Sequence, residues 1–291
     1  MADVAEAIRE TSGFENLGVP FCMTVEAELF GSMVDLGDAG VEPCVTKYGA
    51  GELAEVLRQP LPDPDKDGRS PVVLEAIRLL ASRHKDVPVI GNITGPISLV
   101  TSIMDPLSFF RLLRKAPEEV EAVLDHLTTY LIRFARRQVA CGANVIAIAD
   151  PTATGEILGS ANFRRFVVPM LERLLGEINT TGAGVIVHIC GDAKLLLQDL
   201  REVDGAAFSF DSLVDMRAAK LGLGQAPVMG NLNTQMLHTG EPQRIANMTE
   251  LLVSAGIDII SPACGISLAT PRENLAAFTS TVKGLRNIDR A

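Results

Sequence analysis

His188 and Cys190 lie two residues apart at the end of an apolar run that begins at Gly184. In a β-strand, side chains two residues apart point to the same face, so this spacing gives one face an imidazole and a thiol. These groups are common nitrogen and sulfur ligands of zinc. Because Gly191 and Asp192 interrupt the apolar run, both donors are expected at the carboxyl end of the strand. The pair predicts part of a metal site.

Cys264 is the candidate for a third donor. It follows a second short apolar run, residues 256–262, which also has the pattern of a strand. Two strand ends of one sheet can meet. Three protein donors leave one zinc position open for a reactant, whereas structural zinc usually has four protein donors. The competing interpretation is that these cysteines are small apolar side chains of the core.

The composition favours an aliphatic core and argues against nucleic-acid binding. Hydrophobic residues make up 47% of the 291 residues, only 4% are aromatic, and tryptophan is absent. Such a core suits buried parallel strands and their covering helices. The formal net charge is −10, and the sequence has no dense cluster of lysine and arginine that would bind phosphates. We expect a single domain over residues 1–291 with no nucleic-acid partner.

The N-terminal residues and the cysteines bear on the compartment. The chain does not start with a basic segment followed by an apolar one, and no apolar run approaches the roughly 18 residues of a membrane span. Five cysteines are an odd and sparse set for a chain of this length, which fits reduced thiols better than a disulfide framework. The sequence therefore predicts a cytoplasmic protein without a membrane partner.

Short apolar runs alternate with longer helical patterns along the chain. The helix predicted over residues 117–137 is the clearest, because its apolar residues recur at helical spacing after a proline and two glutamates. Strands alternating with helices predict a parallel sheet of the α/β class. The seven predicted strands are residues 18–22, 87–92, 144–149, 184–189, 206–210, 227–230 and 257–260.

Polar residues follow the predicted strands, where an α/β barrel carries its active site. Turn or helix-cap roles fit Asp150 and Asp211 at least as well as catalysis does. The candidates for orienting a substrate or the metal ligands are Asn92, Asp150 and Asn231, followed by Glu26 and Glu28. The residues at the strand ends are Glu26, Glu28, Asn92, Thr94, Asp150, His188, Cys190, Asp211, Asn231 and Cys264.

Several motifs resemble those of the uroporphyrinogen decarboxylase superfamily, and within it those of the methylcobamide:coenzyme M methyltransferases, and they occur in the order found in that family. They cover residues 91–96, 150–155, 188–192, 230–232, 262–266 and 270–274, and so span most of the chain. The resemblance implies a TIM (β/α)8-type barrel with a catalytic Zn²⁺ held by His188, Cys190 and Cys264. It also implies methyl transfer from a methylated corrinoid, either methylcobalamin or a transiently bound corrinoid protein, to a thiol such as coenzyme M.

Among the candidate catalytic residues, Asp211 resembles the carboxylate that can occupy zinc in such enzymes until a substrate displaces it. Asp150 is the second candidate for a catalytic role. The chain differs from the decarboxylase branch because nothing in it resembles the arginine-rich N-terminal motif that binds tetrapyrrole carboxylates. Porphyrinogen decarboxylation is therefore disfavoured.

A second difference concerns the first strand of the barrel. The sequence begins shortly before the segment 19–28, and our count of seven strands lacks the usual first N-terminal strand. Another segment, another subunit or a separate polypeptide would then have to cover the open seam. The predicted assembly is a homo-oligomer. The functional alternatives are transfer to homocysteine or tetrahydrofolate, lyase chemistry on a tetrapyrrole, and a noncatalytic subunit that binds a corrinoid protein.

Overall fold

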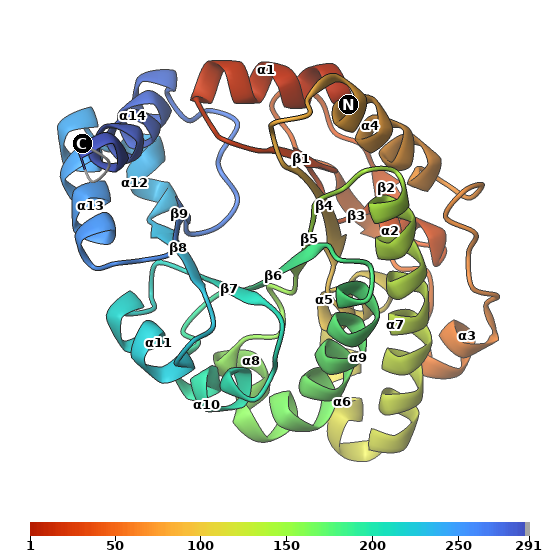
Figure 1. Ribbon diagram of the computed structural model, residues 1–291. Coiled ribbons are helices and arrows are strands. Elements are labelled where there is room, and N and C mark those ends of the chain that lie inside the picture. Colours follow the sequence, from red (N-terminus) through yellow and green to blue (C-terminus); the bar gives the residue numbers. More distant parts are fainter. Residues whose placement is uncertain (289–291) are drawn as a thin grey trace.

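The computed structural model describes residues 1–288, and a curled parallel sheet surrounded by helices forms its centre (Figure 1). This architecture confirms the predicted TIM-type barrel. The seven predicted strands are also confirmed, with ends that differ by a few residues. In spatial order the strands are β1 (Leu17–Val19), β4 (Val89–Thr94), β5 (Val145–Ala149), β6 (Gly184–Ile189), β7 (Ala207–Phe210), β8 (Val228–Leu232) and β9 (Ile259–Pro262).

Helices connect the strands and cover the outer face of the sheet (Figure 1). The predicted helix over residues 117–137 is α7, and the apolar stripe that predicted it is buried. The α-helices are α1 (Ala2–Ser12), α2 (Val25–Leu29), α3 (Leu53–Arg58), α4 (Ser70–Arg83), α5 (Pro96–Ile103), α6 (Pro106–Lys115), α7 (Pro117–Ala140), α8 (Gly155–Asn162), α9 (Val168–Asn179), α10 (Leu197–Arg201), α11 (Met216–Leu223), α12 (Thr234–Thr239), α13 (Pro242–Ser254) and α14 (Arg272–Ile288).

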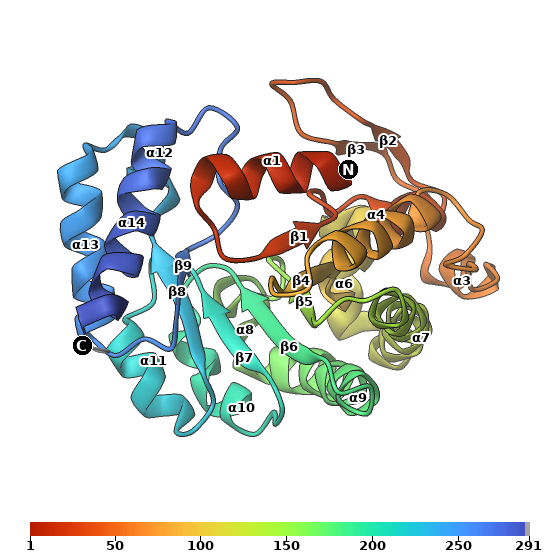
Figure 2. The same ribbon diagram turned by 45° about the horizontal axis from the view of Figure 1, so that its top comes forward.

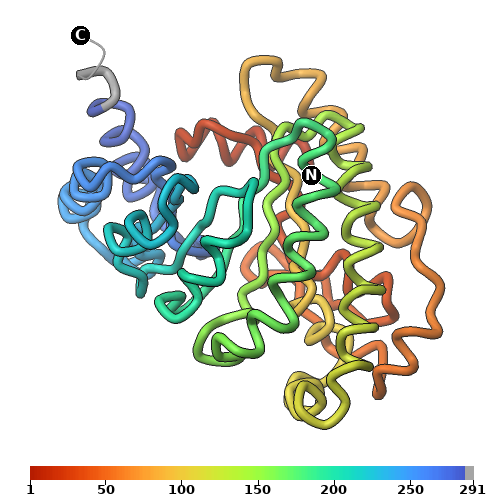
Figure 3. Tube along the Cα trace, turned by 60° about the horizontal axis from the view of Figure 1, so that its bottom comes forward, coloured from red at the N-terminus to blue at the C-terminus, as the bar shows by residue number. Residues whose placement is uncertain are grey.

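The seven-stranded sheet has β1 and β9 as its edges, and the first and last helices meet next to this seam. In Figure 1, α1 lies between β1 and α14. The Thr279 hydroxyl of α14 donates a hydrogen bond to the Ser12 carbonyl of α1 over 2.7 Å, and Phe14 packs edge-on against Phe278. Figure 3 shows from another side that α14 also lies beside α13. Segments of the same chain therefore border the seam.

A hairpin of β2 (Met33–Asp35) and β3 (Cys44–Lys47) was not predicted from the sequence. It is antiparallel, most of its residues are exposed, and Figure 2 shows it projecting beyond the surrounding helices. An exposed strand has no buried face, so it lacks the apolar alternation by which the barrel strands are recognised.

The two faces of the central sheet differ in burial. On β6, Val185, Val187 and Ile189 are buried on the outer face, whereas His188 lies on the inner face and is half-buried. The inner face is therefore the place where polar side chains of the strands can meet a ligand.

No single helix among residues 1–288 is long and apolar enough to cross a membrane. Helices α5 and α6 pass that test only as a pair, and this pair is bent by 117°.

Candidate metal centre and active site

His188, Cys190 and Cys264 come together at the carboxyl edge of the barrel. Their ligand atoms all lie within 4.8 Å of one another. His188 Nε2 is 3.1 Å from Cys190 Sγ, and Cys190 Sγ is 3.5 Å from Cys264 Sγ. The three donors predicted from the sequence thus converge, although 74 residues separate the two cysteines.

Local backbone structure places these side chains. His188 belongs to β6, and Cys190 follows its last residue; Gly191 then turns the chain with φ 71°, a conformation that favours glycine. Beyond β9, the Ala263 amide donates to the Leu232 carbonyl of β8 over 2.8 Å, so the chain stays against the sheet until Cys264.

The contact between the two thiols links their protonation. Hydrogen bonds with Cys190 and His188 lower the pKa of the Cys264 thiol to about 4, although partial burial acts in the opposite direction. The hydrogen bond to Cys264 and burial both raise the pKa of the Cys190 thiol. One thiolate therefore forms readily in this pair, and a cation would favour the second.

These residues fit a zinc ion by chemistry and by arrangement. Two sulfur donors and one imidazole nitrogen form a zinc-type ligand set, and their atoms already face one another. Among residues 1–288, no fourth histidine, cysteine or carboxylate belongs to this group. A zinc ion held by these three donors would keep a coordination position for water or a substrate atom, as catalytic zinc sites do.

Asp211 and Asn231 belong to the loop after β7 and to β8, respectively. The Asp211 carboxylate accepts hydrogen bonds from the Leu213 amide over 3.1 Å and from the Ser212 hydroxyl over 3.3 Å. The Asn231 side chain donates to the carbonyls of Asp211 and Val214 over 2.9 and 2.8 Å. Asn231 therefore holds the loop that carries Asp211, while its predicted substrate contact stays a prediction.

Asp150 is fully buried at the end of β5. Its carboxylate accepts hydrogen bonds from the Ile97 and Ser98 amides over 3.2 and 2.8 Å, and from the Ser98 hydroxyl over 2.7 Å. Burial raises the pKa of this carboxyl to about 6, against the effect of these hydrogen bonds. Asp150 thus caps the first turn of α5, and its catalytic role stays a prediction.

Glu26 and Asn92 join the segment after β1 to β4. The buried Glu26 carboxylate accepts from the Thr94 amide over 2.9 Å and from the Thr94 hydroxyl over 3.1 Å, and burial raises its pKa. The Asn92 side chain donates to the Pro20 carbonyl over 2.9 Å. These contacts fix neighbouring loops, and the substrate-binding roles predicted for both residues are untested by them.

The comparison with known families decides the family of the chain. The model of the uroporphyrinogen decarboxylase family matches residues 1–285. The chain belongs to the uroporphyrinogen decarboxylase family. This result confirms the resemblance inferred from the motifs at the strand ends.

Two relatives within this family are named as methyltransferases. A methylcobamide:CoM methyltransferase of Methanosarcina acetivorans is 32% identical over 290 residues, which cover 98% of this chain and 84% of that protein. A methylated-thiol–coenzyme M methyltransferase of Methanosarcina mazei is 32% identical and covers 97% and 76%, respectively. The uroporphyrinogen decarboxylase of Thermus thermophilus is 31% identical, but the match covers only 70% of this chain and 62% of the enzyme.

Solved structures agree with the family fold. A methyltransferase from Methanosarcina mazei superposes with a TM-score of 0.92 and 30% identity, covering 98% of this chain and 85% of that one. A B12-independent methionine synthase from Shewanella has a TM-score of 0.68 at 14% identity, which shows a shared fold alone. The barrel is thus the common frame of this family member and its relatives.

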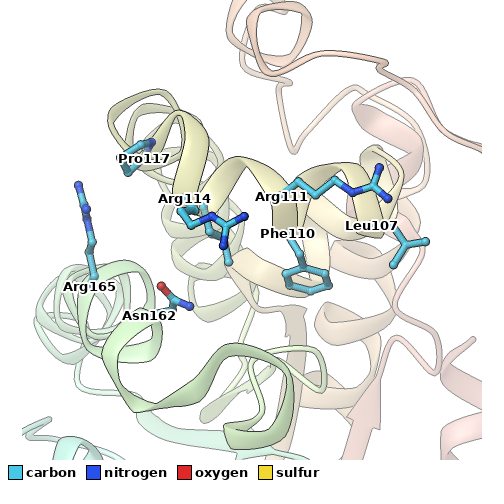
Figure 4. A pocket seen from close by; sticks show the side chains of 8 residues that line it. Leu107, Phe110, Arg111, Arg114, Pro117, Asn162 and Arg165 are labelled. Carbon is cyan, nitrogen blue, oxygen red and sulfur yellow. The ribbon is translucent and has the colours of Figure 1, made fainter.

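One cavity of this family member lies away from the donor cluster. It has a volume of about 660 Å³ and lies between α6 and the segment around α8 (Figure 4). None of the site residues predicted from the sequence lines it. Its lining residues are Leu107, Phe110, Arg111, Leu113, Arg114, Pro117, Asn162 and Arg165.

The sequence did not point to Ser209, whose Oγ on β7 lies 3.0 Å from His188 Nδ1. The available signal was weak: Ser209 is the one polar residue in the strand Ala207–Phe210. A buried hydroxyl in an apolar strand needs a hydrogen-bond partner, but the sequence does not show which strand lies next to β6.

Proposed function

We propose that the protein is a zinc-dependent methyltransferase that moves a methyl group from a methylated corrinoid to the thiol of coenzyme M. The convergence of His188, Cys190 and Cys264 at the carboxyl edge of the barrel is the observation that carries this proposal. The relatives named for methyl transfer between methylcobamide and coenzyme M support the reaction class.

The three donors explain how the substrate thiol, a weak nucleophile while it is protonated, would be activated. Zinc bound by them would supply positive charge that favours the thiolate form of a substrate thiol at neutral pH. As thiolates, Cys190 and Cys264 would offset much of this charge, so that the substrate sulfur keeps its electron density. The His188 ring would complete the donor set from the same strand as Cys190.

The proposed reaction is a displacement on the methyl carbon of methylcobamide. The substrate thiol loses its proton to solvent, and its sulfur forms a bond to the methyl carbon. The cobalt–carbon bond breaks as this bond forms, and both of its electrons stay on cobalt, which changes from Co(III) to Co(I). The barrel positions the two reactants and shields them from water. Asp211 is our candidate for the donor that occupies the open position when no thiol is bound.

The partners and the compartment are part of the proposal. A corrinoid protein would be a transient partner, because the corrinoid has to reach the carboxyl edge of the barrel where the donors lie. The other reactant is a small thiol. Assembly as a homo-oligomer and a cytoplasmic location stay predictions from the sequence.

The first experiment measures metal content and methyl transfer on the same preparations. Wild type, Cys264→Ser and the exposed control Cys44→Ser are each incubated with methylcobalamin and with coenzyme M, homocysteine or tetrahydrofolate. We expect about one zinc per chain and methylation of coenzyme M in wild type and in Cys44→Ser. Cys264→Ser should lose both, because it removes one of the three donors.

The other outcomes separate the alternatives. Absence of zinc from the wild type would remove the chemical basis of the proposal, and transfer only to tetrahydrofolate would contradict the thiol mechanism. Methylation of homocysteine alone would change the acceptor but keep the mechanism. Zinc without turnover would favour a noncatalytic subunit that binds a corrinoid protein. Carbon dioxide released from uroporphyrinogen would favour a lyase.

A further inference from the structure

Ser209 contacts the imidazole of His188 from the neighbouring strand. The two residues are partners in the parallel register of β6 and β7, so their side chains leave the same face of the sheet. Ser209 Oγ lies 3.0 Å from His188 Nδ1, and Ser209 is only 4% exposed. Within residues 1–288, the Ser209 hydroxyl has this one side-chain hydrogen-bond partner.

The contact leaves the other ring nitrogen on the side of the thiols. His188 Nε2 lies 3.1 Å from Cys190 Sγ, so the ring reaches Ser209 with one nitrogen and the donor cluster with the other. A neutral imidazole carries its proton on one nitrogen only, and the other nitrogen holds the lone pair that can bind a metal. A partner that accepts a proton from Nδ1 therefore leaves Nε2 free as a ligand.

We propose that Ser209 is a positioning residue that selects the Nδ1–H tautomer of His188 and fixes the ring orientation. The Ser209 hydroxyl oxygen accepts the hydrogen bond from Nδ1–H, and Nε2 then points at the position shared with Cys190 and Cys264. This inference rests on the proposed function, in which these three donors hold zinc. It also gives β7, which supplies none of the three donors, a part in the site.

A purely structural role for Ser209 makes a different prediction. Its neighbours Phe208 and Phe210 are fully buried on the opposite face and anchor β7 without the hydroxyl. If the hydroxyl served only the fold, its loss would lower the stability of the metal-free protein and leave the intrinsic zinc affinity unchanged. If it positions His188, its loss weakens zinc binding in a protein that is still folded.

The test compares zinc affinities of wild type, Ser209→Ala and Ser209→Thr by competition with a chromophoric chelator. Ser70→Ala is the matched control, since Ser70 is a buried serine whose hydroxyl contacts Tyr130 away from the donors. We expect Ser209→Ala to bind zinc about 10- to 100-fold more weakly, the range for residues that orient a metal ligand. Ser209→Thr, which keeps a hydroxyl, should recover most of the affinity, and Ser70→Ala should match wild type.

Thermal unfolding of the metal-free proteins separates folding from positioning. Equal zinc affinity of wild type and Ser209→Ala would overturn the role of Ser209, and so would a loss accounted for by unfolding of the metal-free variant. Absence of zinc binding by wild type would instead overturn the proposed function itself.

A measurement on the wild type decides the tautomer even where a variant does not fold. In ¹⁵N-histidine NMR spectra of the zinc-loaded protein, we expect the proton of His188 on Nδ1. A proton on Nε2 would overturn the inference.

Discussion

The polar residues at the ends of β6 and β9 differ from those near β4 and β5 in what they contact, although both groups lie at the carboxyl edge of the sheet. His188, Cys190 and Cys264 contact one another through their ligand atoms. Asp150 and Glu26 are buried, and backbone amides donate hydrogen bonds to their carboxylates. Position at a strand end therefore does not by itself identify a catalytic residue; the contacts of the side chain do.

The difference has a simple physical origin. A buried carboxylate is costly unless donors surround it, and the amides at the start of α5 supply them for Asp150. Sulfur and imidazole nitrogen tolerate partial burial with fewer partners, so their lone pairs stay available to a cation. We call these two sets the donor group (His188, Cys190 and Cys264) and the carboxylate group (Asp150 and Glu26).

The largest expected effect is protection of the donor group by zinc. In the metal-free protein, the lowered pKa of Cys264 should make it react fastest with iodoacetamide at neutral pH. Zinc should slow alkylation of Cys264 by more than about 100-fold, because a thiolate that shares electron density with a metal is a weaker nucleophile than a free thiolate. Cys190, whose pKa is raised in the metal-free protein, should react slowly with and without zinc. Peptide mass spectrometry over time measures the rate at each cysteine.

Exposed Cys44 is the internal control for this experiment. Its rate should change by less than about twofold on zinc addition, because it lies outside the donor group. Equal protection of Cys264 and Cys44, or of neither, would contradict the assignment of the donor group.

The next largest effect concerns stability and the carboxylate group. Asp150→Ala should lower the free energy of unfolding by about 3 kcal/mol, because two buried amides of α5 lose their acceptor. Zinc content should stay unchanged. Asp105→Ala is the control: Asp105 caps the exposed start of α6 through the Ser108 amide and should cost only about 1 kcal/mol.

Denaturant titrations measure both losses of stability. The catalytic role predicted for Asp150 is tested separately, by measuring turnover under conditions in which the variant is folded. An unchanged rate would limit Asp150 to capping. A rate that falls by orders of magnitude in a folded, zinc-loaded variant would place Asp150 in the reaction instead.

The barrel was predictable because strands such as β5 and β6 are largely aliphatic, with one face buried and the other mostly half-buried. Runs such as Val145–Ala149 consist of aliphatic residues bounded by turn residues, and this pattern is strong in sequence. The hairpin of β2 and β3 escaped prediction because exposed strands carry no such pattern. Helices α1 and α14 border the seam because the two ends of the chain contact each other, and local sequence patterns do not reveal such contacts.

The donor group was predictable for a chemical reason. Few residue types bind zinc, and the spacing of His188 and Cys190 fixes a shared face. The carboxylate group shows the limit of that argument, because aspartate and glutamate serve as caps as readily as catalysts. Ser209 shows a second limit. Its contact with His188 depends on the register between β6 and β7, which only the structure gives.

A third prediction uses pH to probe the carboxylate group at Glu26. Burial raises the pKa of Glu26 in the folded protein, so the stabilising, protonated form is present at acid pH and its contribution is lost as pH rises through the raised pKa. Glu26→Gln cannot ionise, and its amide can still pair with Thr94. The variant should therefore gain stability relative to wild type as pH increases.

Urea unfolding between about pH 4 and pH 8 measures this difference. The nearby charge of Arg69 acts against the shift, but burial is the larger cause. A difference that is constant over this range, or that shrinks as pH rises, would contradict a raised pKa for Glu26.

The smallest expected effect concerns Asp211, which belongs to neither group. If its carboxylate occupies the open position on zinc, Asp211→Asn should weaken zinc binding without thiol by up to about tenfold, or ~1.4 kcal/mol. The loop should persist, because the asparagine oxygen can still accept from the Leu213 amide. Saturating coenzyme M should abolish the difference, since the thiol then replaces the carboxylate.

Asp192→Asn is the matched control for Asp211→Asn, because Asp192 makes the same kind of contact with the Lys194 amide, over 2.9 Å. Chelator competition measures the zinc affinity of wild type, Asp211→Asn and Asp192→Asn, each with and without coenzyme M. A loss that is equal with and without thiol would mean that Asp211 acts through its charge or its loop and not as an exchangeable ligand. A zinc ion held by the donor group would then take its fourth ligand from solvent. The loop held by Asn231 would serve only to shape the edge of the site.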